Sequence, residues 1–184
     1  MAKYDKNTIT DLIDGKLEWS ERKRIISDHK DADRFEKVVT ILQERVPWKE
    51  KILLPLAEHL YVVQKGKERI VKAGCGYEFG DYRENGKHKS KVFVLNTPER
   101  LQEMYRNWEH SDAQWQEMRE FYCPGCFALL GVEQVPIGYP PVFEMLPDLD
   151  TFYRAWLGKP LPDEQPDWFQ DRTLEKPAQW AKGK

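Results

Sequence analysis

The sequence contains little cysteine and no long apolar run. Only three of its 184 residues are cysteines, whereas a small secreted domain that depends on disulfide bonds carries a larger, even-numbered set. No apolar stretch approaches the roughly 20 residues that a membrane-spanning helix needs. The polar N-terminal residues 1–16 also lack the apolar segment of a signal peptide. We therefore expect a cytoplasmic protein without a membrane partner.

A block of basic residues is also absent. The 29 lysine and arginine residues are interspersed with 31 aspartate and glutamate residues, and the formal net charge is −2. Binding of nucleic acid through its phosphates requires a basic patch or stripe, so no nucleic-acid partner is expected. Apolar residues make up 40% and charged residues 33% of the chain, which predicts one domain with a small core.

Glycine motifs that bind nucleotides are missing as well. The stretch "VKAGCGYEFG" (71–80) contains Gly74, Gly76 and Gly80, but their spacing does not match Gly-x-Gly-x-x-Gly. No helical pattern follows them, so no helix N-terminus is available for a phosphate. The motif Gly-x-x-x-x-Gly-Lys-Ser/Thr occurs nowhere in the chain. We interpret these glycines as positions where the backbone turns tightly around a cysteine sulfur.

Helical and strand patterns are both present. Apolar residues at helical spacing predict two short helices within 7–28. They also predict one helix in each of the ranges 31–47, 98–108, 111–122 and 148–158. Runs rich in β-branched and apolar residues predict strands at 60–64, 69–73, 91–96 and 126–133. The first two of these strands flank "KGKE" and are expected to form a hairpin.

The expected fold class is α+β. It combines a helical N-terminal part, a small antiparallel zinc-ribbon-like β region, further helices and an extended C-terminal tail. We assign residues 1–158 to a single domain with a ribbon-like insert around 60–133. The tail, 159–184, has four prolines, two tryptophans and few aliphatic residues, so it cannot build its own core. We expect it to bind a partner through exposed aromatic side chains: Trp168, Phe169 and Trp180.

The three cysteines are the residues that most clearly indicate a chemical role. Cys123-Pro-Gly-Cys126 is a knuckle that presents two thiolates from one tight turn, and Cys75 precedes a glycine at a predicted strand end. Two such elements, joined by antiparallel strands, form a zinc-ribbon-like site with four tetrahedral ligands. His88, on the connecting segment, is the first candidate for the fourth ligand; water or a carboxylate is an alternative. The other histidines are less well placed: His29, His59 and His110.

Two other interpretations of the cysteines are open. Three reduced cysteines without a metal would have the same sequence. A thiol oxidoreductase would carry its Cys-x-x-Cys at the start of a helix that follows a strand, where the thiolate pKa is lowered. Here Cys123 and Cys126 follow a predicted helix and precede an apolar, strand-like run, which favours the metal site.

Six stretches in chain order resemble one known family. They are "ITDLIDGKL", "DADRFEKVVTILQERVPWKEKILLPLAEHLYVVQ", "CGYEFGDYRENGK", "NTPERLQEMY", "REFYCPGCFALLGVE" and "PDLDTFYRAWLGKPLP". With them the chain resembles the small gamma subunit of acetone carboxylase and of the related acetophenone carboxylase. The resemblance runs from about Ile9 to Pro162, and a collinear match of this length is more specific than any single motif.

The resemblance implies a multisubunit, ATP-dependent and biotin-independent carboxylase that adds bicarbonate to the methyl carbon of a ketone and forms a 3-oxo acid. Large hydantoinase-like subunits would carry ATP, any other metal, the substrate and the chemistry. This chain would be a structural subunit that holds zinc and has no catalytic residue of its own. A free-standing zinc-ribbon module that binds another protein is the alternative.

The chain departs from the resemblance at the first knuckle. Acetone carboxylase has Cys-x-Cys-Gly-His there, whereas residues 73–77 of this chain are "AGCGY". Cys75, Cys123 and Cys126 match the pattern, but position 73 offers no ligand, and His88 would have to complete the set. The departure indicates a divergent member, for which we expect acetophenone, converted to benzoylacetate, ahead of acetone, converted to acetoacetate.

Overall fold

The computed structural model describes residues 4–106, 110–164, 170–175 and 177. Its elements in chain order are α1 (Lys6–Ile13), α2 (Trp19–Ser27), α3 (Arg34–Arg45), β1 (Lys51–Ala57), β2 (Leu60–Lys65), β3 (Glu68–Ala73), β4 (Glu78–Asp81), the 3₁₀ turn η1 (Gly86–Lys89), β5 (Lys91–Leu95), α4 (Pro98–Tyr105), β6 (Gln116–Tyr122), β7 (Leu129–Pro136), α5 (Leu149–Thr151) and the π-helical turn η2 (Phe152–Trp156). The expected α+β class is confirmed. Within the described part of the chain, no helix is long and apolar enough to cross a membrane.

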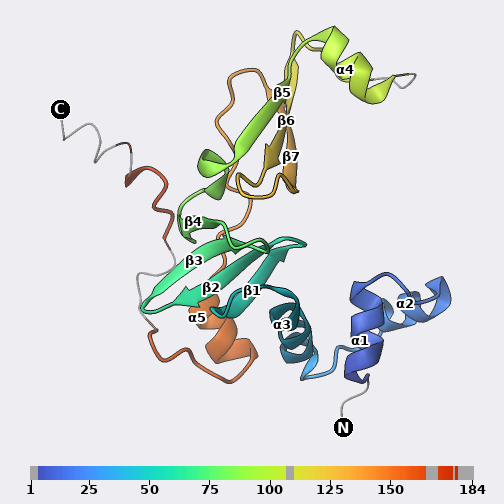
Figure 1. Cartoon of the computed structure of the whole chain (residues 1–184), viewed down its shortest axis with the longest axis vertical. Coiled ribbons are helices and arrows are strands. Elements are labelled where there is room, and N and C mark those ends of the chain that lie inside the picture. Colours follow the sequence, from blue (N-terminus) through green and yellow to red (C-terminus); the bar gives the residue numbers. More distant parts are fainter. Residues whose placement is uncertain (1–3, 107–109, 165–169, 176, 178–184) are drawn as a thin grey trace.

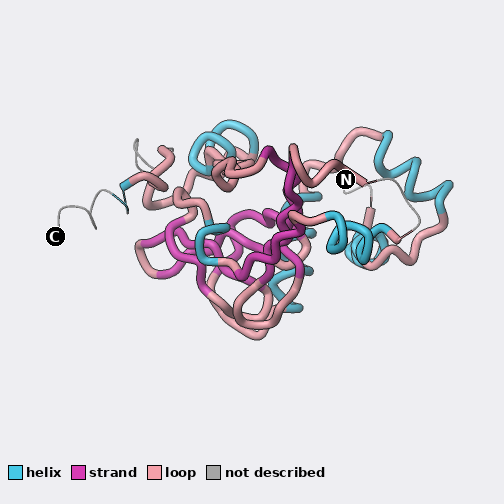
Figure 2. Tube along the Cα trace, turned by 90° about the horizontal axis from the view of Figure 1, so that it is seen from above, coloured by secondary structure: helices cyan, strands magenta, loops and turns pink. Residues whose placement is uncertain are grey.

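The strands form two antiparallel sheets. The first has the order β1-β2-β3-β4 and the second the order β5-β6-β7. Neighbours in each sheet are also neighbours in sequence, which is the arrangement that short connections between antiparallel strands allow. In Figure 1 the second sheet stands above the first, with α4 beyond its far end. Seen from above, the strands lie together and the helices lie around them (Figure 2).

Helix α3 links the N-terminal helices to the first sheet. One side of it packs on α1 and α2 through Val38 and Ile41. Another side places Val39 and Leu42 against the sheet, where they contact apolar side chains of β1, β2 and β3. Apolar residues on more than one side of a helix indicate that it is covered on each of those sides. The predicted helix at 31–47 is therefore confirmed, and α3 lies between two small cores.

The opposite face of the first sheet is covered by α5 and η2. Leu53, Val62 and Val71, which alternate along their strands with the residues that face α3, pack against Leu149 and Tyr153. Full burial of an aliphatic side chain contributes about 1.5–3 kcal/mol relative to exposure. This second core therefore attaches residues 149–156, which are distant in sequence from the strands, to the first sheet.

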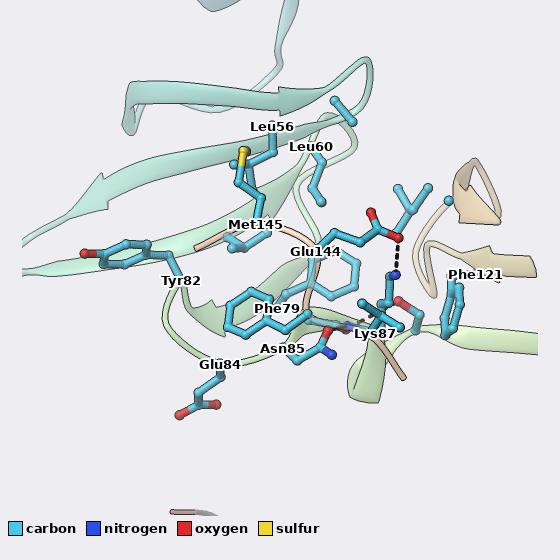
Figure 3. A pocket seen from close by; sticks show the side chains of 18 of the residues that line it. Leu56, Leu60, Phe79, Tyr82, Glu84, Asn85, Lys87, Phe121, Glu144 and Met145 are labelled. Atoms are coloured by element: carbon cyan, nitrogen blue, oxygen red, sulfur yellow. Dashed lines mark hydrogen bonds and ion pairs between the residues drawn. The ribbon is translucent and has the colours of Figure 1, made fainter. Parts of the chain in front are cut away.

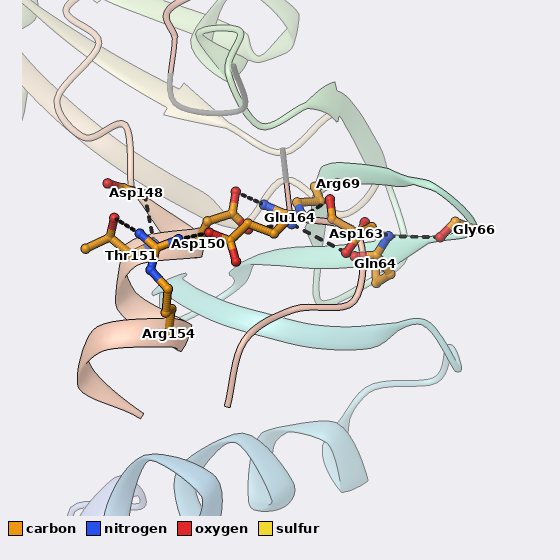
Figure 4. Close-up of polar contacts among 9 residues, drawn as sticks. All are labelled: Gln64, Gly66, Arg69, Asp148, Asp150, Thr151, Arg154, Asp163 and Glu164. Atoms are coloured by element: carbon orange, nitrogen blue, oxygen red, sulfur yellow. Dashed lines mark hydrogen bonds and ion pairs between the residues drawn. The ribbon is translucent and has the colours of Figure 1, made fainter. Parts of the chain in front are cut away.

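An ion pair also ties this segment to the sheet (Figure 4). Arg69 on β3 is buried and donates to both carboxylate oxygens of Asp150, at 2.9 and 2.7 Å. Its Nη2 also lies 3.4 Å from Oδ1 of Asp163, and Oδ2 of Asp163 accepts a hydrogen bond from Gln64 at 3.0 Å. Leu161 is buried in the same core. The first residues of the C-terminal tail thus pack on the first sheet.

Further along the tail, the described residues contact the connection between β4 and η1. The backbone amide of Arg172 donates to Arg83 O at 2.8 Å, and the hydroxyl of Thr173 accepts from the amide of Asn85 at 3.0 Å. The aromatic residues expected to bind a partner, Trp168, Phe169 and Trp180, lie outside the described residues. Partner binding by the tail stays a prediction.

Several predicted elements need correction. The helix predicted at 111–122 is wrong: residues 116–122 form β6, the central strand of the second sheet. The prediction rested on the helical spacing of Trp115 and Met118. The strand lacks the usual alternation of apolar and polar residues, because its buried face carries charged side chains that form an ion pair, Glu117 and Arg119. The strand predicted at 126–133 lies further along the chain, as β7 at 129–136, and the strands β1 and β4 were not predicted. Pro55 in β1 sits beside a register irregularity of this edge strand, one of the positions where a sheet accepts proline.

The buried hydroxyl of Tyr153 leads to a pH prediction. It donates to Leu53 O at 2.8 Å, and burial raises the pKa of Tyr153 to about 12, above the value of about 10 for an unfolded tyrosine. The folded state therefore retains the proton more strongly, so this contribution to stability is complete below pH 10 and is lost as the pH rises toward 12.

Tyr153→Phe should consequently lose less stability than the wild type between pH 9.5 and 11.5. At pH 8 the variant should be less stable by about 1 kcal/mol, because Leu53 O loses its hydrogen bond. Urea unfolding at a series of pH values measures both effects. Tyr139→Phe, at an exposed tyrosine, is the control, and equal slopes for Tyr153→Phe and the wild type would contradict the prediction.

Candidate metal centre

The three cysteines meet where the two sheets approach each other. Cys75 lies in the turn between β3 and β4, and Cys123 and Cys126 lie in the turn between β6 and β7. Their Sγ atoms all lie within 4.8 Å of one another, and those of Cys75 and Cys123 are 3.6 Å apart. The predicted approach of the two turns is therefore present in the fold.

The sulfur distances fit a shared zinc ion. Zinc binds thiolate sulfur at about 2.3 Å, and a tetrahedral arrangement then places neighbouring sulfur atoms about 3.8 Å apart. The 3.6 Å between Cys75 and Cys123 is close to that value. A disulfide would require about 2.05 Å, and all three cysteines are free thiols. The three side chains thus provide three thiolate ligands with little rearrangement.

The turn between β6 and β7 is closed by two backbone hydrogen bonds. The amide of Cys123 donates to Ala128 O at 2.9 Å, and the amide of Phe127 donates to Cys123 O at 2.8 Å. Phe127 adopts a φ of 59°, a left-handed conformation that is uncommon for a bulky residue. The backbone therefore turns sharply at the residue after Cys126 and directs the Ala128 amide at the Cys126 sulfur.

The turn between β3 and β4 repeats this pattern with one residue fewer. The amide of Ala73 donates to Tyr77 O at 2.8 Å, and the amide of Gly76 donates to Ala73 O at 2.9 Å. Gly76, directly after Cys75, has the left-handed φ, 101°. Matching of the hydrogen bonds places Ala73 where Cys123 lies in the other turn. The position that would hold a fourth thiolate is therefore occupied by a methyl group.

Glycine at position 125 lets the two turns touch. A Cβ atom there would lie 3.1 Å from the Cys75 sulfur and 3.2 Å from Cβ of Tyr77, closer than nearly all such contacts. Only a residue without a side chain permits this approach. The glycine between Cys123 and Cys126 thus serves the packing of one turn on the other.

The three thiols differ in their electrostatic surroundings. Cys123 is fully buried. The backbone amide of Ala128 lowers the pKa of Cys126, whereas desolvation beside the other thiols raises the pKa of Cys75 to about 11. A bound cation would offset the repulsion among three thiolates, since zinc binding removes the thiol protons. The cluster has the chemistry of a metal site, and its position where turns of the two sheets meet suits a structural one.

The histidines do not join this group. Among the described histidine, cysteine, aspartate and glutamate residues, the ligand atoms that gather here belong to the three cysteines alone. His88 lies in η1 and is not brought to them. His59 approaches the first turn: its Nδ1 is 3.9 Å from the position of a Cβ on Gly74. The sequence contained no signal for that approach, which depends on the hairpin between β1 and β2.

A cavity of about 160 Å³ is lined by residues of both sheets (Figure 3). Apolar side chains such as Phe79 and Phe121 form most of its wall. The ammonium of Lys87 pairs with Glu133 at 2.5 Å and with Glu144 at 2.6 Å. These polar groups therefore bond to one another, and the residues that line the cavity include no histidine or cysteine.

Comparison with known proteins gives a consistent result. Residues 46–157 match a family model described as acetone carboxylase gamma subunit. A curated protein of Xanthobacter autotrophicus (strain ATCC BAA-1158 / Py2), described as "Acetone carboxylase gamma subunit", is 39% identical over 162 residues, which cover 87% of this chain and 96% of that protein. The matched range contains both cysteine turns.

Proposed function

Because the chain belongs to the family of acetone carboxylase gamma subunits, we propose that it is the structural, non-catalytic small subunit of a multisubunit ketone carboxylase. Its membership of the family makes it a subunit of a carboxylase complex. The observation that carries the structural role is the cysteine cluster, which joins a turn of the first sheet to a turn of the second. The cavity walls, with their mutually paired polar groups, support the same role.

The complex would join bicarbonate to the methyl carbon of a ketone at the expense of ATP and without biotin, and would release a 3-oxo acid. ATP, the ketone and any catalytic metal would bind to larger, hydantoinase-like subunits in the cytoplasm. We place acetophenone, giving benzoylacetate, ahead of acetone, giving acetoacetate. The support for this preference is the departure at Ala73 and Tyr77, which indicates a divergent member of the family.

Zinc would be held by Cys75, Cys123 and Cys126. Bound there, it would crosslink the turn of the first sheet to the turn of the second and so fix the angle between them. The fourth ligand would be water or a group outside the described residues, and His88 is left out of the set because η1 keeps it apart from the cysteines. Ala73 and Gly125 would shape the surroundings of the ion without touching it.

The test is to isolate the chain gently from its host grown on a ketone and to weigh the intact assembly by mass spectrometry. We expect larger subunits in fixed stoichiometry and one zinc per copy of this chain, measured on the same sample. A chain recovered alone as a monomer would contradict the subunit role and favour a free-standing zinc-ribbon module. Carboxylation of a ketone by the isolated chain would contradict the non-catalytic role.

A further inference from the structure

One face of the second sheet carries exposed apolar side chains around a buried carboxylate. Glu120 on β6 lies directly between Phe93 on β5 and Val132 on β7, and residues paired in this way lie on the same face. Tyr122 and Leu129 form the next pair on that face. Glu120 is 7% exposed, whereas Phe93 and Val132 are each 47% exposed. We call these five residues the Glu120 patch.

The other described parts of the chain leave this patch uncovered. At the far end of the same face, Leu95 and Met118 are buried under Leu101 of α4. The helix ends there, and Leu129 is 48% exposed on the side of the patch toward the cysteine turns. A half-covered sheet face with adjoining exposed apolar side chains is typical of a protein interaction site.

Glu120 itself has little to balance its charge. Its carboxylate accepts one hydrogen bond, from the Tyr122 hydroxyl at 2.6 Å, and no lysine or arginine of the described residues forms an ion pair with it. The guanidinium of Arg100 lies over the Phe93 ring, 5.7 Å from its centre, but donates to Val94 O. A carboxylate that is nearly buried and lacks a cation is costly for a fold.

The other buried acids of this sheet are paired with cations. Glu117 accepts from Arg119 on the same strand, and Glu133 binds Lys87 at 2.5 Å. Both lie on the opposite face from Glu120. Glu117 is an odd number of residues from Glu120 along β6, and Glu133 pairs with Arg119, the residue next to Glu120. Glu120 thus differs from its neighbours in lacking an ion-pair partner among the described residues.

We propose that the Glu120 patch docks on another subunit of the carboxylase, and that this subunit presents an arginine or lysine, flanked by apolar side chains, to the Glu120 carboxylate. The proposal rests on the subunit role stated above. Covering the patch with an apolar surface alone would bury the carboxylate without a partner, so the contacting surface must supply a cation. Phe93 and Val132 would then exclude water from the pair, as the surroundings of interface hot spots do.

A second copy of this chain fits the patch less well. In a symmetric dimer the same patch would meet itself, and two Glu120 carboxylates would approach each other, because the lysine of this face, Lys91, lies at its edge beside Tyr122 and not opposite Glu120. Like charges opposed across an interface are unfavourable. Charge complementarity therefore favours a different subunit.

The test measures binding of the full chain to the remaining subunits of the complex. Glu120→Gln keeps an oxygen that can accept from Tyr122 but removes the charge, and Val132→Ser removes part of the apolar rim. We expect at least about a tenfold weaker Kd for Glu120→Gln, a further loss for Glu120→Lys, and a measurable loss for Val132→Ser. Glu58→Gln and Glu58→Lys make the same charge changes at an exposed acid in the turn between β1 and β2 and should bind as the wild type does.

Thermal unfolding of each isolated variant separates docking from folding. Glu120→Gln should leave the melting temperature of the free chain unchanged or raise it, since it removes a charge without a counterion. Wild-type affinity in both Glu120→Gln and Val132→Ser would overturn the docking assignment alone. A wild-type chain that binds no other subunit would overturn the subunit role with it. A free wild-type dimer that Glu120→Lys converts to monomers would overturn the proposal in favour of a second copy.

Discussion

Replacing Ala73 with cysteine is expected to raise the zinc affinity of the chain roughly a hundred-fold. The two turns are closed by the same two kinds of backbone hydrogen bond, with one residue fewer in the first turn, and Ala73 stands where Cys123 stands in the other turn. Its side chain is 1% exposed, so a thiolate at this position would be held among the other sulfur atoms and away from water. The variant would change a three-thiolate site into a four-thiolate site.

The size of the effect follows from the usual energy of structural zinc sites. Their apparent binding free energies are about 10–16 kcal/mol, or about 3 kcal/mol for each of four ligands. One ligand is therefore equivalent to about two orders of magnitude in Kd. The gain should appear only when zinc is present, since cysteine is little larger than alanine and the metal-free protein should unfold much as the wild type does.

Competition with a chromophoric chelator measures the zinc Kd, and substitution by cobalt counts the thiolates through the intensity of the sulfur-to-metal charge-transfer band. Cys126→Ser is the opposite change, and it should weaken zinc binding by a similar factor. Ala57→Cys, which adds a thiol at the exposed end of β1, is the control. An Ala73→Cys protein with wild-type zinc affinity and cobalt spectrum would show that position 73 does not face the metal.

The approach of the three cysteines could be predicted from the sequence because the information is local. Cys-x-x-Cys specifies a tight turn by itself, and glycine after Cys75 indicates a second one. The sequence could not predict which histidine lies near the cysteine turns, because the paths of η1 and of the hairpin between β1 and β2 depend on packing between distant segments. His88 therefore stayed apart from the cysteines, while His59 approached the turn that contains Gly74.

The same distinction explains the success with α3 and the failure with β6. In α3 the apolar residues face two different cores, but all of them recur at helical spacing, so the helical pattern is visible in the sequence. A strand with one covered face is expected to carry an apolar residue at every second position. In β6 two of these positions are held by Glu117 and Arg119, which are buried as an ion pair. Ion pairs inside a sheet remove the alternation on which strand prediction depends. The Glu120 patch was hidden for a related reason, since the register of three strands decides which residues share a face.

The second large effect is expected at Arg69, the buried cation between the first sheet and the segments that follow the second sheet. Arg69→Met should lower the free energy of unfolding by about 3–5 kcal/mol, the typical result when one member of a buried ion pair is removed. The methionine fills much of the space, so the loss arises mainly from Asp150, which is 8% exposed and would keep its charge without the guanidinium. Asp163 and the start of the C-terminal tail would lose a contact as well.

Urea unfolding of a small set of variants distinguishes charge from packing. If the uncompensated carboxylate causes the loss, the double variant Arg69→Met/Asp150→Leu should recover most of it, because a well-packed apolar pair replaces a buried ion pair at little cost. Arg154→Met breaks the nearby pair of Arg154 with Glu164 (Figure 4), where the arginine side chain is 53% exposed, and should cost less than about 1 kcal/mol. A double variant as unstable as Arg69→Met would instead mean that the guanidinium is needed for its shape and for Asp163. The attachment of the tail to the first sheet would then depend on Arg69 itself.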